Sequence, residues 1–107
     1  MQIITGTLVD MSLDLDGKGV SNIFFLTERR KPLTVTVSKS YVRVCDDEFS
    51  NTIYEGNLVD SEIVLGKANC YILFEGSLFG QPAAYRLEFN LTSRAFSFDS
   101  RAIVNVK

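Results

Sequence analysis

The sequence predicts an all-β protein, a single-domain antiparallel β-sandwich or small β-barrel of about seven to eight strands. Apolar and polar residues alternate through most of the chain, which is the spacing of strands and not of helices. Turn-forming residues recur at short intervals between the alternating runs. The chain has 107 residues, 46% of them apolar, so we expect residues 1–107 to form one domain without a linker or internal repeat.

The first predicted hairpin lies near the N-terminus. Its first strand has a buried face that alternates with acidic or polar residues and consists of Val9, Met11, Leu13 and Leu15. The DGKG motif at 16–19 contains residues that accept a positive φ and predicts the turn. Residues 20–27 form the second strand, which ends at the cations and the proline of 28–32.

The apolar pattern changes parity in the middle of the chain. Apolar residues occupy odd positions from 33 to 37 but even positions at Val42 and Val44, which predicts a bulge, bend or turn at Ser38–Ser40. Residues 51–65 fit either a pair of strands or a helical turn, although Gly56 weakens a helix.

Three further strands are predicted after residue 66. Residues 70–80 form a strand in which Gly76 indicates a bend or a close approach of two backbones. Alternation is regular over 83–92, a turn follows, and a last run of apolar residues shares one parity from Phe96 onward.

The residues needed for common catalytic mechanisms are missing from the sequence. There is no histidine, which excludes Ser–His–Asp and Cys–His nucleophilic sites. Three acids follow Cys45 and disfavour its thiolate, and two isolated cysteines do not form a zinc site. The DGKG motif lacks the distal glutamate of a calcium-binding loop, and no glycine-rich phosphate loop is present. We therefore expect no enzymatic activity, no cofactor and no metal.

The composition also limits the location and the partners. A net charge of −2 argues against nucleic acid, and no apolar run is long enough to span a membrane. The N-terminus does not resemble a signal peptide, so we expect a cytoplasmic protein. A disulfide between Cys45 and Cys70 and two buried free thiols are both compatible with the sequence, and a reducing compartment favours the thiols.

One segment carries a marked excess of negative charge. Six acids and no lysine or arginine lie between Val44 and Gly66, whereas bases outnumber acids in the rest of the chain. Exposed aromatic residues among carboxylates are typical of interfaces, and a solvated loop with an exposed strand face is the structural alternative. The predicted partner-binding residues are Asp46, Asp47, Glu48, Phe49, Tyr54, Glu55, Asp60 and Glu62, together with Asp14 and Asp16 from the first hairpin.

The leading functional hypothesis is a non-enzymatic protein-binding module whose acidic surface masks a basic protein partner. An immunity protein that inhibits a cognate toxin, such as a nuclease, is one example of this class. The first alternative is a small barrel that binds a hydrophobic ligand, because eight phenylalanines and four tyrosines are available to line a cavity. The second alternative is a structural or assembly subunit. The sequence leaves the oligomeric state open.

Overall fold

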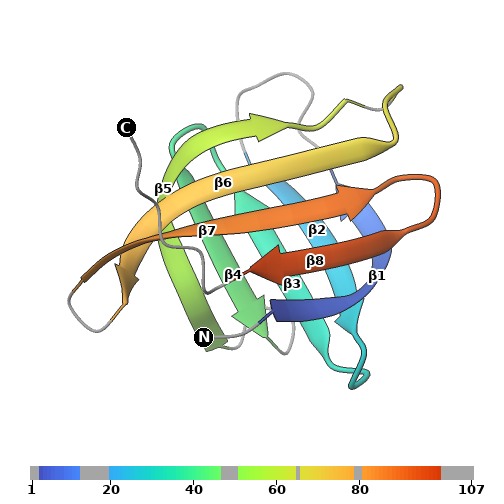
Figure 1. The fold of residues 1–107 in the computed structure, drawn as a ribbon, viewed down its shortest axis with the longest axis horizontal. Helices are drawn as coiled ribbons and strands as arrows, with labels where there is room; N and C mark the ends of the chain where they lie inside the picture. Colours follow the sequence, from blue (N-terminus) through green and yellow to red (C-terminus); the bar gives the residue numbers. More distant parts are fainter. Residues whose placement is uncertain (1–2, 13–19, 47–50, 65, 79–80, 100–107) are drawn as a thin grey trace.

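The structure is a computed structural model that describes residues 3–12, 20–46, 51–64, 66–78 and 81–99. Eight antiparallel strands form a closed barrel in which each strand neighbours the next and β8 returns to β1 (Figure 1). The strands are β1 (Ile3–Ser12), β2 (Ser21–Thr27), β3 (Pro32–Val37), β4 (Tyr41–Asp46), β5 (Asn51–Glu62), β6 (Asn69–Leu78), β7 (Gln81–Asn90) and β8 (Ala95–Asp99).

The predicted all-β class is confirmed, and the architecture is a barrel and not a sandwich. The turn expected at Ser38–Ser40 separates β3 from β4. Residues 51–62 form one long strand. These residues therefore contain neither the helical turn nor the pair of strands that the sequence allowed for 51–65. The described part of the chain contains no helix long and apolar enough to cross a membrane. The predicted turn at 16–19, the inward positions Leu13 and Leu15, and the last apolar run beyond 99 lie outside the described residues.

The prediction that Val9 faces the core is wrong. Leu8 pairs with Phe25 and Asp10 pairs with Phe24, so β1 has a bulge at Val9 that leaves 54% of this residue exposed. The extra residue moves the inward position to Leu8, which is buried. A period-two pattern does not reveal this shift because Leu8 and Val9 are both apolar.

Aromatic side chains fill much of the barrel interior. Phe25 on β2 and Phe96 on β8 lie on the two strands that flank β1, and their ring centroids are 4.3 Å apart. A second group of rings has centroid distances of 5.1 to 6.1 Å and consists of Tyr54, Phe74, Tyr85 and Phe98. Each fully buried ring stabilises the fold by roughly 1.5–3 kcal/mol through removal of apolar surface from water.

The barrel consists of two equivalent four-stranded halves, which the sequence analysis did not find. The tripeptide Leu8–Asp10 recurs as Leu58–Asp60, and Gly6 recurs as Gly56, two residues before each tripeptide. The structure places a bulge within each tripeptide, at Val9 in β1 and at Val59 in β5. The amide of Leu8 bonds to the carbonyl of Arg94, and the amide of Leu58 bonds to that of Ser40, at matching turns. The expectation of no internal repeat is therefore wrong.

The strand pairings match between the two halves except at Ile53, where β5 has a bulge that β1 lacks. Counted from the bulges, Ile23 and Ile72 occupy equivalent positions. Ile23 pairs with Val35 in the first half, and Ile72 pairs with Leu87 in the second. The strands β1 to β4 therefore correspond to β5 to β8 in order. The inward positions are mostly aliphatic in the first half and aromatic in the second, as in the pairs Ile4 and Tyr54, Leu33 and Tyr85, Val37 and Phe89, Val42 and Phe96, and Val44 and Phe98. Small residues on one side leave room for rings on the other, which fills the interior without excess volume.

Two glycines allow strands of the second half to approach closely. A Cβ on Gly56 would lie 1.9 Å from the carbonyl oxygen of Glu75, and a Cβ on Gly76 would lie 2.5 Å from that of Glu55. The close approach that the sequence predicted for Gly76 is therefore present. Gly6 plays the same role in the first half, where a Cβ would lie 2.1 Å from the carbonyl oxygen of Leu26.

We expect Gly56→Ala to lower the free energy of unfolding by at least about 1–3 kcal/mol, because its methyl group overlaps backbone that cannot move freely. Gly66→Ala is the control, since a Cβ there meets nothing within 4 Å, and we expect a change below about 0.5 kcal/mol. Urea denaturation of both variants measures the difference. Equal unfolding midpoints would contradict the close approach of β5 and β6.

Candidate functional site

The outer surface of three adjacent strands carries most of the negative charge that the described strands hold. The strands β5, β6 and β7 contain five acids and a single base, Arg86. The acids alternate with inward residues and point to the outside of the barrel, and all are exposed or half-buried: Glu55, Asp60, Glu62, Glu75 and Glu88. We call this surface the acidic face. It arises because the polar positions of three neighbouring strands share one side of the sheet.

Tyrosines on neighbouring strands hold two of these carboxylates in place. The hydroxyl of Tyr71 on β6 donates a hydrogen bond of 2.9 Å to Asp60 on β5. The hydroxyl of Tyr41 on β4 donates to Glu55, and the guanidinium of Arg43 lies 3.9 Å from the same carboxylate. Both tyrosines are half-buried and bridge adjacent strands. Fixing the carboxylates in this way reduces the conformational entropy that a partner would have to remove on binding.

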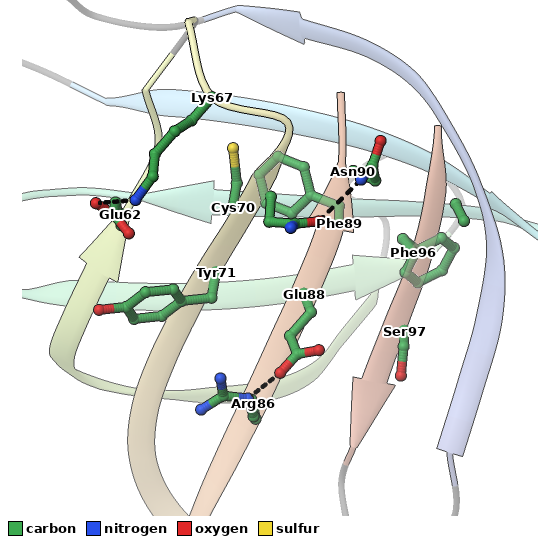
Figure 2. Close-up of a pocket in the computed structure, with 12 residues that line it drawn as sticks. Glu62, Lys67, Cys70, Tyr71, Arg86, Glu88, Phe89, Asn90, Phe96 and Ser97 are labelled. Atoms are coloured by element: carbon green, nitrogen blue, oxygen red, sulfur yellow. Dashed lines mark hydrogen bonds and ion pairs between the residues drawn. The ribbon is translucent and has the colours of Figure 1, made fainter. Parts of the chain in front are cut away.

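An open depression of about 600 Å³ lies on the acidic face, beside Tyr71 (Figure 2). On one side Lys67 donates a hydrogen bond of 2.9 Å to Glu62, and on the other Arg86 bonds to Glu88. The Arg86 guanidinium also lies over the Tyr71 ring, 5.5 Å from its centroid. These ion pairs are largely exposed, so each contributes little to stability and its carboxylate stays accessible to a partner.

The carboxylates change the ionisation of their neighbours. The hydrogen bond to Asp60 is the main cause that raises the pKa of Tyr71, followed by burial and the negative charges nearby. Glu55 raises the pKa of Tyr41 through the same kind of hydrogen bond, against the lowering effect of Arg43. The bond to Glu62 raises the pKa of Lys67. Both tyrosine hydroxyls therefore remain protonated donors at neutral pH.

The predicted site residues are distributed along the full length of β5. Glu55, Asp60 and Glu62 lie on the acidic face, whereas Asp46 is half-buried at the end of β4, opposite Asn51. Asn51 and Glu62 are the two ends of a 12-residue strand, so Asp46 and Glu62 lie at opposite ends of β5. These acids therefore do not form a single compact cluster.

Tyr54 was expected to be an exposed aromatic anchor, and the structure places its ring in the core. Its centroid lies 5.2 Å from that of Tyr85 and 5.1 Å from that of Phe98. A bulge between Val44 and Cys45 on the pairing of β4 with β5 leaves Ile53 outside and directs Tyr54 inward. The remaining predicted residues, Asp14, Asp16, Asp47, Glu48 and Phe49, lie outside the described residues.

Sequence reasoning missed the two tyrosines that complete the site. Tyr41 and Tyr71 lie just outside the acidic segment in the sequence, and only the strand pairing brings them to Glu55 and Asp60. The signal that was available is their parity, because each tyrosine alternates with buried neighbours and must point outward.

The cysteines and potential metal ligands offer no further chemistry among the described residues. Cys45 and Cys70 are both buried and free, so the disulfide that was considered is not formed. In the part of the chain that the structure covers, no three His, Cys, Asp or Glu side chains are grouped to hold a metal ion. No protein-family model, curated protein or solved structure matches this chain.

We expect the folded protein to lose stability as the pH rises above about 10, the ordinary pKa of tyrosine. The pKa values of Tyr41, Tyr71 and Tyr85 are raised in the folded state, for Tyr85 mainly by burial. Groups with a raised pKa contribute their full stability below the unfolded value and lose it as pH rises through the folded value. Urea denaturation between neutral and alkaline pH measures this decline, and a flat profile above pH 10 would contradict it.

Absorbance titration of the tyrosinates identifies the interaction that causes one of these shifts. Asp60→Asn removes the negative charge beside Tyr71, so the pKa of Tyr71 should fall toward its ordinary value. Asp10→Asn is the matched control, because Asp10 occupies the equivalent bulge and its carboxylate accepts a bond from the backbone of Met11. An identical titration for both variants would show that Asp60 does not control Tyr71.

Proposed function

We propose that this protein is a non-enzymatic protein-binding module that uses the acidic face to bind a basic protein partner. The observation that carries the proposal is the Asp60–Tyr71 pair beside the depression, where a fixed carboxylate and a half-buried aromatic ring stand together. Tyrosine rings and oriented charges are the side chains that dominate binding energy at interfaces. Long-range attraction from five carboxylates would raise the rate of association with a basic surface.

Inhibition is the form of this activity that the charge pattern supports best. A basic partner that itself binds phosphate, such as a nuclease toxin, presents a groove of cations that carboxylates can occupy in place of the phosphates. An immunity protein acts in this way. The exposed ion pairs with Lys67 and Arg86 can be exchanged for cations of the partner at little cost.

The interior favours this proposal over the ligand-carrier alternative. Rings contact each other in the barrel interior, where Phe25 of the first half meets Phe96 of the second and Phe74 meets Tyr85 within the second half. A barrel of eight strands has an interior that side chains alone can fill. Both cysteines are free thiols, which a reducing compartment maintains, so we place the protein in the cytoplasm as part of this proposal.

We expect Asp60→Lys and Glu62→Lys each to weaken partner binding on the order of tenfold, equivalent to about 1.4 kcal/mol. The tagged protein is used to capture proteins from the lysate of its host at low and moderate salt. The retained basic protein is identified by mass spectrometry, purified and titrated by calorimetry. Affinity should also fall as salt is added, since exposed charges are screened.

Glu28→Lys is the matched control, because it makes the same charge change at an exposed turn away from the acidic face. Its affinity should equal that of the wild-type protein. Circular dichroism confirms that each variant folds. The proposal fails if no basic protein is retained, or if the Asp60 and Glu62 variants bind as well as the control.

A further inference from the structure

We infer that the first half of the barrel carries a second binding surface, on which two copies of this chain associate as a twofold-symmetric dimer. This surface is an apolar groove of about 580 Å³ on the outside of β1, β2 and β3. Its apolar lining includes Val9, which is 54% exposed, Leu26, which is 37% exposed, and the half-buried Phe24 and Pro32. It lies on different strands from the acidic face and is independent of the proposed function.

The equivalent surface of the second half shows that the fold does not require an apolar residue at the position of Leu26. Both surfaces are built on the same bulge and the same strand pairings. Counting along the pairings, Leu26 corresponds to Glu75, which is exposed, and Thr34 corresponds to Arg86. The barrel therefore accepts charged residues at these positions. Leu26 lies in one groove with Val9, Phe24 and Pro32, and a contiguous exposed apolar surface of this kind marks an interaction site.

The charges beside the groove favour a second copy of the chain as that partner. Asp10 lies at one end, beside Phe24. The exposed turn between β2 and β3 lies at the other end, and its sequence, Glu28-Arg29-Arg30-Lys31, has an excess of two positive charges. Glu28, the first residue of this turn, is four positions beyond Phe24, a distance of about 13 Å. The groove is thus bounded by negative charge at one end and positive charge at the other.

A twofold rotation exchanges the two ends of such a groove. When two copies meet face to face about an axis near Leu26, Asp10 of each copy faces the basic turn of the other. Each contact then occurs twice, as in all isologous interfaces. A partner with one sign of charge would match only one end, whereas a second copy matches both. The apolar centre of the groove, with Val9 and Leu26, is buried between the two barrels.

Sedimentation velocity over a range of concentrations tests this inference on the wild-type protein. We expect a reversible dimer with twice the monomer mass. Val9→Lys should weaken dimerisation at least tenfold, because it places a charge within the apolar centre. Val59→Lys is the matched control, since Val59 occupies the equivalent bulge and is 52% exposed, and its dimerisation should be unchanged.

Exchanging the charges at the two ends of the groove tests the twofold symmetry of the dimer. Asp10→Lys and Lys31→Glu should each weaken the dimer, and the double variant should recover most of the loss because the two charges have changed places. A wild-type protein that is monomeric at all concentrations would overturn the inference. A dimer that Val9→Lys leaves intact, or that Val59→Lys weakens equally, would overturn it as well. Partner binding at the acidic face is not used in any of these measurements.

Discussion

Hydrogen bonding between β1 and β8 turns eight strands into a closed barrel whose interior receives side chains from every strand. Closure fixes the interior volume, so the two halves must fill it together. The aliphatic first half and the aromatic second half meet this constraint, and Phe25 of the first half contacts Phe96 and Phe89 of the second. Gly6 and Gly56 allow neighbouring strands to approach closely, because a Cβ at either position would overlap the backbone of the next strand.

The same constraint gives different roles to the inward and the outward residues of each strand. Inward positions are committed to packing, and the outward positions of the strands remain free to differ between the halves. At equivalent places the second half carries Glu75 and Arg86 where the first half carries Leu26 and Thr34. One backbone design therefore supports an acidic face and an apolar groove, to which we assign a basic partner and a second copy of the chain.

Most strands could be predicted from the sequence because alternation and turn residues act locally, as the regular pattern that became β7 shows. The bulges could not be predicted, because a bulge at Val9 or Ile53 depends on pairing with another strand. The orientation of Tyr54 was wrong for this reason. Glu55, Asp60 and Glu62 were found from their charge alone, whereas Tyr41 and Tyr71 required the register. The repeat was missed because the halves share backbone pairings more than side chains.

We propose that the outer surface of β5 to β7 binds a basic protein. Amide chemical-shift mapping tests it directly, with the isotopically labelled protein titrated by the basic protein fraction of its host's lysate. We expect shifts concentrated on the acidic face, at Glu55, Asp60, Glu62 and Tyr71, with the amides of buried residues such as Ile23 and Val35 unchanged. Shifts confined to β1 to β3, or to the residues of the interior, would contradict it.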